Sequence, residues 1–144
     1  MSNEFKKRLS VSPYEINLRK VADNWLADKV LVQKSKEGYS DLLNKVIKNG
    51  FSDELVAGIY EAESNNLKLH EFKFIFVENR AILDSLPKDS SLHNINQIII
   101  NLIESRGNIT SVGVSKSLLN AIQPTDLDKE FYQNIVILFY SSIL

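Results

Sequence analysis

Histidines and carboxylates are the residues of this sequence whose types suit acid–base or metal chemistry. The two histidines, His70 and His93, fall in different predicted helices, and neither belongs to a His-Glu-x-x-His motif or an aspartate-rich calcium loop. Cysteine is absent, which excludes thiolate metal sites, disulfides and cysteine nucleophiles. We therefore expect no metal site.

Paired carboxylates and nucleophile motifs give no catalytic candidate either. Glu61 with Glu63, and Asp53 with Glu54, are spaced so that on a helix the two side chains point in different directions and cannot share a substrate. The Gly-x-Ser-x-Gly turn is missing, and residues 113–116 (Gly-Val-Ser-Lys) lack the Ser-x-x-Lys order. No glycine-rich phosphate loop occurs. We expect no catalytic residue, no cofactor and no enzymatic activity.

Charge is distributed unevenly along the chain. Residues 1–50 hold ten Lys or Arg against six Asp or Glu, and residues 51–144 hold seven against twelve, so a net charge of −1 hides halves of +4 and −5. The basic cluster consists of Lys6, Lys7, Arg8, Arg19 and Lys20. The acidic residues that we expect on one face are Glu54, Glu61, Glu63, Glu71 and Glu78. Such halves either help each other to pack or attract a charged partner.

The function that we favour is a non-enzymatic protein-binding module, such as an inhibitor, immunity protein, chaperone or adaptor. Its acidic face would cap a basic active site of another protein, since that task requires complementary charge and a few anchors rather than catalytic groups. The candidate aromatic anchors are Tyr39, Tyr60, Tyr132 and Tyr140.

The alternative is a small helical nucleic-acid-binding protein that uses the basic N-terminal half. A helix-turn-helix over residues 98–119 vaguely resembles the opening of a winged-helix domain. Its candidate reading helices contain Lys116 alone and Lys129 alone as basic residues, so phosphate contacts are missing where that arrangement needs them.

Helices are the elements that must position these residues. Apolar residues recur every three or four positions, and the few glycines and prolines fall mostly between the periodic segments. We expect helices over residues 12–34, 39–49, from Ser52, 67–87, 90–106, 111–122 and from Thr125 onward. The expected inward residues are Tyr14, Leu18, Val21, Ala22, Trp25, Tyr39, Leu42, Leu43, Val46, Ile47, Leu55, Val56, Ile59, Tyr60, Leu69, Phe72, Phe76, Leu83, Leu86, Leu92, Ile95, Ile99, Leu102, Ile103, Leu127, Phe131, Ile135, Leu138 and Phe139.

Three local signals refine these boundaries. Asn49-Gly50 is a favoured left-handed helix end, Ser52 can cap the next helix, and Pro124 cannot continue the helix before it.

Gly58 marks either a close helix crossing or a harmless surface position. Residues 67–77 also alternate as a strand would, but no partner strand is evident, so we favour a helix there.

The predicted fold is therefore an all-α, compact bundle of about seven helices, with a short helical-repeat array as the alternative. We expect one helical domain over residues 1–144, with residues 1–11 a flexible basic segment. No signal-peptide core or membrane-spanning run is evident, so the expected location is cytoplasmic. The last helix is apolar on more than one side (Ile137, Tyr140, Ile143), which means that it is either central or shared in a homodimer.

Overall fold

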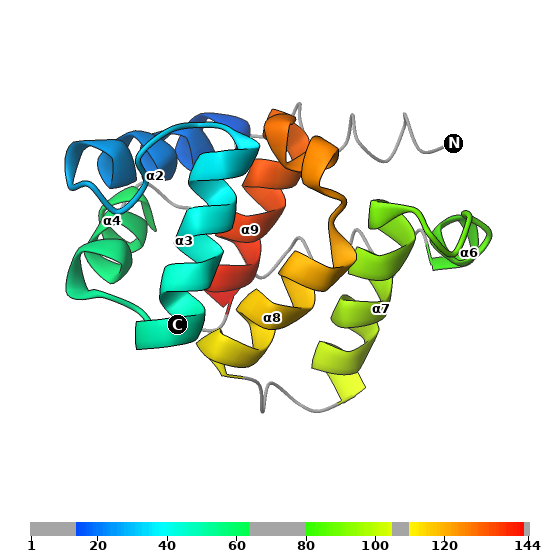
Figure 1. The fold of residues 1–144 in the computed structure, drawn as a ribbon. Coiled ribbons are helices and arrows are strands. Elements are labelled where there is room, and N and C mark those ends of the chain that lie inside the picture. The colour runs from blue at the N-terminus through cyan, green and yellow to red at the C-terminus, as the bar shows by residue number, and fades with distance from the viewer. Residues whose placement is uncertain (1–13, 64–79, 105–109, 143–144) are drawn as a thin grey trace.

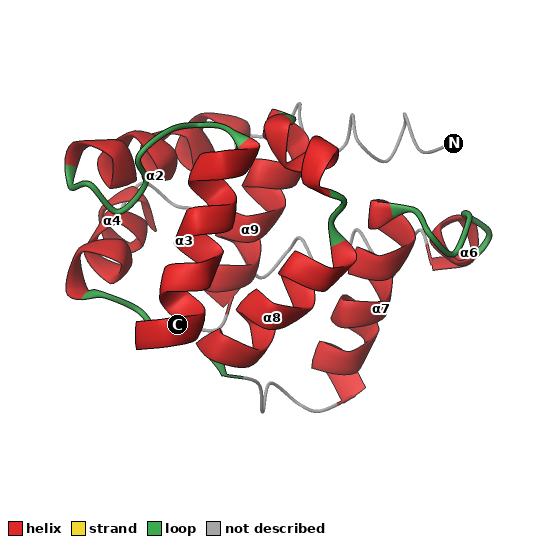
Figure 2. Ribbon diagram, viewed as in Figure 1, coloured by secondary structure: helices red, strands yellow, loops and turns green. Residues whose placement is uncertain are grey.

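The computed structural model describes residues 14–63, 80–104 and 110–142, and all regular structure in these ranges is helical (Figures 1 and 2). The elements are α2 (Tyr14–Ala27), α3 (Lys36–Asn49), α4 (Asp53–Glu63), α6 (Arg80–Asp84), α7 (Ser91–Glu104), α8 (Ser111–Ala121), the 3₁₀ helix η2 (Pro124–Asp128) and α9 (Glu130–Ser142). This arrangement confirms the predicted compact helical bundle, with close to the expected number of helices. The predictions for residues 1–11 and 67–77 lie outside the described ranges.

Helix α9 is the centre of the bundle. It packs against α2, α8 and η2, and α3 in turn packs along α8 (Figure 1). The six consecutive residues from Ile135 to Tyr140 are each at most 1% exposed. A helix that is buried around its whole circumference must be apolar on every side, and this one is. Ile137 and Tyr140 are thus covered within the chain, whereas Ile143 lies outside the described residues. The homodimer stays a prediction.

Helix α2 buries the stripe that its sequence predicts but ends earlier than expected. Leu18, Val21, Ala22 and Trp25 are buried. The prediction that this helix runs to Lys34 was wrong, because Lys29 adopts a left-handed conformation (φ 61°) and ends it. The Val30 N–H donates to the carbonyl of Trp25 (2.8 Å) and the Lys29 N–H to that of Leu26 (3.3 Å), which is the Schellman pattern. The end of the helix could not be predicted from Lys29, because the left-handed position is usually occupied by glycine or asparagine.

Helix α3 begins and ends on side-chain and backbone signals. The Ser35 hydroxyl accepts a hydrogen bond from the Gly38 N–H, and Gly50 ends the helix with φ 73°, as the Asn49-Gly50 pair predicts. Asp128 of η2 also accepts a hydrogen bond from the Lys36 N–H at 2.7 Å. This contact satisfies one of the backbone donors that the first turn of a helix leaves unpaired.

Helix α4 crosses α2 at Gly58. A Cβ atom at this position would lie 2.8 Å from Cδ1 and 2.9 Å from Nε1 of Trp25, closer than packed side chains come. The Trp25 indole donates to the Leu55 carbonyl (3.0 Å) and the Asn24 amide to the Gly58 carbonyl (3.2 Å). Of the two interpretations of Gly58, a close helix crossing or a harmless surface position, the structure confirms the close crossing. The predicted Ser52 cap is also present, since its hydroxyl accepts from the Leu55 N–H.

The C-terminal third begins with α7, whose Leu92, Ile95 and Ile99 are buried as expected. The Thr110 hydroxyl caps α8 by accepting from the Gly113 N–H at 3.0 Å. The single helix predicted from Thr125 onward was wrong: the chain forms η2, becomes extended at Lys129 and starts α9 at Glu130. Burial of Leu127 and the contact between Asp128 and α3 stabilise η2 as a 3₁₀ helix, which is wound more tightly than an α-helix.

Candidate functional site

Glu54 and Glu61, which were both predicted for the acidic face, lie on one outward side of α4. Glu54 and Glu61 are both exposed and seven residues apart, which is two helical turns. Asp53 and Ala57 are exposed on the same helix. The side chain of Glu63, and the whole of Glu71 and Glu78, fall outside what the structure describes. The structure therefore brings together two of the five residues predicted for an acidic face.

Tyr60 is the aromatic residue that accompanies these carboxylates. The prediction that it faces inward was wrong, since 53% of Tyr60 is exposed. The buried side of α4 consists of Leu55, Gly58, Ile59 and Ala62, and Gly58 instead takes the position against Trp25. Position 60 is one residue beyond Ile59, about 100° further around the helix, and so it points toward solvent.

The other three candidate anchors are buried and cannot reach a partner. Tyr39, Tyr132 and Tyr140 are 1%, 5% and 0% exposed. Tyr140 lies between Trp25 and Phe51, with ring centroids 6.5 and 5.0 Å away, and its hydroxyl bonds to Ser115. Tyr39 was also predicted to face inward, and its burial confirms that prediction; as exposed anchors all three tyrosines were wrong. A tyrosine on an amphipathic helix has the same spacing whether its hydroxyl reaches solvent or a buried partner.

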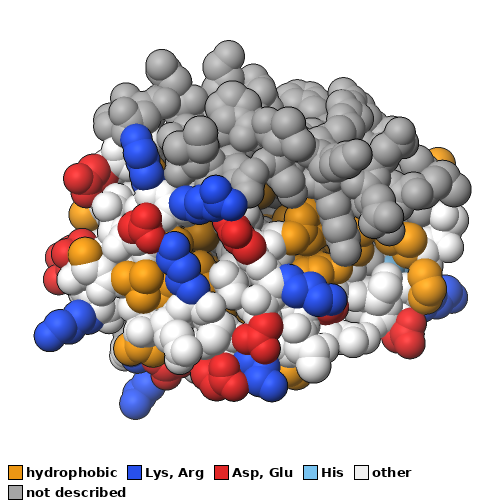
Figure 3. Space-filling view, turned by 90° about the horizontal axis from the view of Figure 1, so that it is seen from above, with side chains coloured by type: hydrophobic (Ala, Val, Ile, Leu, Met, Phe, Trp, Pro, Cys, Tyr) orange, Lys and Arg blue, Asp and Glu red, His pale blue; other side chains and the backbone are white. Residues whose placement is uncertain are grey.

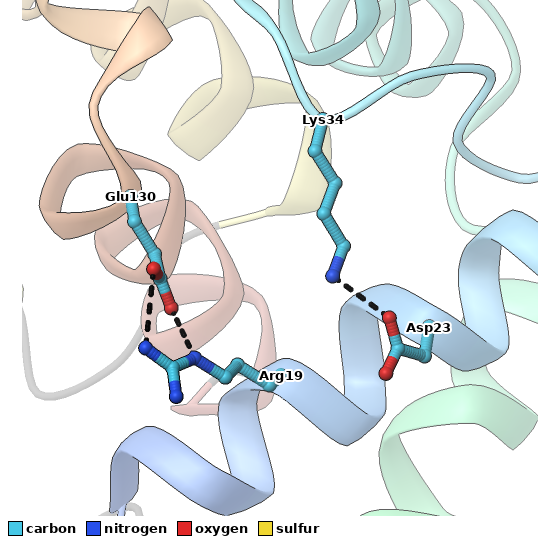
Figure 4. A network of polar contacts seen from close by, with 4 residues as sticks. All are labelled: Arg19, Asp23, Lys34 and Glu130. Carbon is cyan, nitrogen blue, oxygen red and sulfur yellow. Dashed lines mark hydrogen bonds and ion pairs between the residues drawn. The ribbon is translucent and has the colours of Figure 1, made fainter.

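Arg19, from the predicted basic cluster, is engaged in an ion pair (Figure 4). Its Nε lies 2.6 Å from Oε1 of Glu130 and its Nη2 lies 3.4 Å from Oε2, a two-point contact that joins α2 to α9. Lys20 is exposed beside it. Lys6, Lys7 and Arg8 lie outside the described residues. Arg19 and Glu130 are 111 positions apart in the sequence, so no local sequence pattern predicts this ion pair.

A second ion pair lies close to the first and, together with it, borders a polar cavity. Lys34, in the loop after α2, donates to Asp23 Oδ1 at 2.7 Å (Figure 4). The cavity holds about 260 Å³ and is lined by residues of α2, this loop, α3, η2 and α9. Arg19, Lys34, Asp128 and Glu130 supply charges of both signs, and Tyr39, Gln133 and Asn134 supply neutral polar groups.

The Tyr39 side chain connects this cavity with the core. Burial raises the pKa of its phenol well above the usual value, and the nearby carboxylates of Glu130 and Asp23 raise it further. These two carboxylates belong to the two ion pairs. The Tyr39 hydroxyl therefore stays protonated at neutral pH.

A second cavity, also about 260 Å³, lies beside the first turn of α4. Its apolar lining includes Leu42, Val46 and Leu55, and Asp28, Lys29, Lys45 and Glu54 add charges of both signs. The acidic face of α4 is therefore next to a depression whose lining is partly apolar and partly charged.

The described residues contain no group of three or more His, Asp or Glu side chains arranged to hold a metal ion. His93 Nδ1 contacts the Leu83 carbonyl at 3.3 Å, and His70 is not among the described residues. Ser115, the serine next to Lys116, is buried and donates to the Ser111 carbonyl, so it is engaged in helix α8.

Charges of both signs are interspersed over the part of the upper face that Figure 3 draws in colour, with apolar side chains between them. No helix in the described ranges is long and apolar enough to span a bilayer. The chain matches no protein family, no curated protein and no solved structure. Any functional assignment must therefore come from its own surface and cavities.

Proposed function

We propose that this chain is a non-enzymatic protein-binding module that contacts its partner through the outer face of α4. The observation that carries the proposal is Tyr60, a large aromatic side chain that is 53% exposed on a helix whose neighbouring exposed positions include Glu54 and Glu61. Tyrosine is enriched among the residues that contribute most to binding, and surrounding charges orient and accelerate the encounter.

The depression next to Glu54 adds a place for an apolar group of the partner. Its lining combines the apolar Leu42, Val46 and Leu55 with charged residues of both signs, namely Asp28, Lys29, Lys45 and Glu54. One protruding aliphatic side chain of the partner fits this depression because it buries apolar area there, while Glu54 and Glu61 attract a basic surface around it.

Helix α4 is well suited to present these groups because its inner side is fixed. Trp25 packs against Gly58 and donates to the Leu55 carbonyl, and Asn24 donates to the Gly58 carbonyl. A surface that is already ordered loses less conformational entropy on binding than a flexible one.

The proposal is tested by placing a photoreactive phenylalanine analogue at Tyr60 and, as a control, at Lys48, an exposed position on α3. In cells of the source organism, we expect one protein adduct from position 60 and none from position 48. The double variant Glu54→Lys, Glu61→Lys should abolish this adduct, whereas Glu37→Lys, a single reversal at an exposed position of α3, should leave it.

Binding of the purified partner should then weaken with added salt and with Tyr60→Ala, the latter by about 2 kcal/mol if Tyr60 is a central anchor. The proposal fails if position 60 gives no adduct, or if the adduct survives reversal of both carboxylates. A nucleic-acid adduct would instead favour the alternative function.

A further inference from the structure

Asn49-Gly50 is the one asparagine–glycine pair in the sequence, and it stands at the end of α3. An asparagine side chain can react with the backbone nitrogen of the residue that follows it, and glycine makes this easiest because it has no Cβ to obstruct the approach. Asn49 is exposed, and a Cβ atom at Gly50 would meet nothing within 4 Å. Neither burial nor crowding therefore protects this pair from the reaction.

A backbone hydrogen bond engages the nitrogen that would react. The Gly50 N–H donates to the Val46 carbonyl at 2.7 Å, and Gly50 caps the C-terminal end of α3 with φ 73°. The reaction requires this nitrogen to lose its proton and to turn toward the Asn49 side chain, so the bond to Val46 must break first. While the last turn of α3 is closed, the pair is therefore unreactive.

The last turn of α3 can open while the chain on both sides of it stays in place. Helix ends open more readily than helix centres, because each opening breaks only the bonds of the last residues. Val46 is buried before this turn, and after it the Phe51 ring lies against Tyr140 with ring centroids 5.0 Å apart. Residues 47–50 between them are half-buried or exposed. Opening can therefore be confined to this short stretch.

We propose that Asn49 is a site of spontaneous deamidation whose rate is set by local opening at the end of α3. The Gly50 nitrogen gives up its proton and attacks Cγ of Asn49, and ammonia, formed from the side-chain NH₂ group and that proton, leaves. The product of this step is a cyclic succinimide. Water then opens the ring at either carbonyl carbon, which gives aspartate or isoaspartate at position 49.

Both products add a negative charge beside the depression at the first turn of α4. Asn49 contributes to the lining of this depression, whose charged members are two acidic and two basic side chains: Asp28, Glu54, Lys29 and Lys45. Asn49 is also the last residue of α3, where the carbonyl end of the helix disfavours an anion. The modification therefore changes the charge of the depression and weakens the turn whose opening controls the reaction. It does not depend on the partner proposed for α4.

The test follows the purified full chain by intact mass and peptide mapping during incubation at mildly alkaline pH, where the backbone nitrogen loses its proton more easily. We expect aspartate and isoaspartate to accumulate at position 49. Asn44, an exposed asparagine in the middle of the same helix, should stay unmodified. Asn49→Gln keeps an amide at the position but closes the corresponding larger ring far more slowly, so this variant should yield no product there on the same time scale.

Ile135→Val separates local opening from unfolding of the whole bundle. The variant removes one carbon from the buried side of α9, a change mild enough to leave the chain folded. It should raise the unfolded population about fivefold. Local opening predicts an unchanged rate at Asn49, whereas a requirement for complete unfolding predicts the same increase in that rate.

Urea at a concentration that unfolds the chain should accelerate the reaction at Asn49, because the hydrogen bond to Val46 is then absent. The proposal is overturned if Asn49 deamidates no faster than Asn44, if its rate follows the unfolded population in Ile135→Val, or if unfolding in urea leaves the rate unchanged.

Discussion

Helices α9 and α4 differ in how much of their surface is exposed to solvent. Along α9 every residue from Ile135 to Tyr140 is buried, so this stretch of the helix has no outer face. Along α4 one side packs closely on Trp25, while Glu54, Tyr60 and Glu61 remain exposed. The stability of the bundle should therefore depend on α9 and its contacts, and recognition on the exposed side of α4. This separation means that stability and binding can be changed independently.

The largest effect should come from removing an aromatic side chain from α9. Phe139→Ala is expected to lower the free energy of unfolding by about 3–5 kcal/mol, because it deletes a fully buried ring and leaves a cavity. Tyr60→Ala, the matched truncation on α4, should change that free energy by no more than about 0.5 kcal/mol. Urea denaturation of both variants measures the difference. Equal losses would contradict the contrast between the two helices.

A smaller but still clear effect is expected where α4 meets α2. Gly58→Val should destabilise the chain by about 2–3 kcal/mol, because the added atoms collide with the rigid indole of Trp25. Ala57→Val, next to it on the exposed side, should cost about 0.6 kcal/mol through helix propensity alone. If thermal or urea denaturation shows the same loss for both, the crossing is looser than the structure indicates.

The smallest of these effects concerns the phenol of Tyr140 in α9. Burial raises the pKa of this group above its unfolded value of about 10, partly offset by the hydrogen bond with Ser115. Since the folded state then holds the proton more tightly, this contribution to stability is fully present below about pH 10 and is lost at higher pH, by about 1.4 kcal/mol per pH unit.

Tyr140→Phe should make the decline above pH 10 shallower by that amount when unfolding is followed from pH 9 to 11. Burial also raises the pKa of Tyr39, and burial together with Asp126 raises that of Tyr132 to about 12, so part of the decline should persist in the variant. An identical pH profile in both proteins would contradict the buried environment of Tyr140.

The helices themselves could be predicted because their signals are local. Asn49-Gly50, Ser52 and the three-to-four spacing of Leu18, Val21 and Trp25 each act within a few residues of the chain. The exceptions have tertiary causes. Lys29 takes a left-handed conformation that its side chain does not favour, and η2 is held by contacts with α3 that are far away in sequence.

The candidate sites were predictable only in part. The acidic stripe of Glu54 and Glu61 follows from helical spacing, but which side of α4 packs inward depends on the contact between Gly58 and Trp25. The polar cavity could not be inferred, because Tyr39, Lys34 and Glu130 come from different elements and carry no shared motif. Whether an individual tyrosine is exposed depends similarly on its neighbours in space.

The position of Trp25 has a practical consequence, because it is the only tryptophan in the sequence. Its ring is enclosed under α4 and donates its N–H to that helix, so its emission reports on the junction of two helices rather than on the average of many sites. Opening of the junction would expose the indole to water and shift its fluorescence to longer wavelength. The chain therefore carries an intrinsic optical probe directly beneath the surface proposed for recognition, and ligand titrations can be followed without attaching a dye.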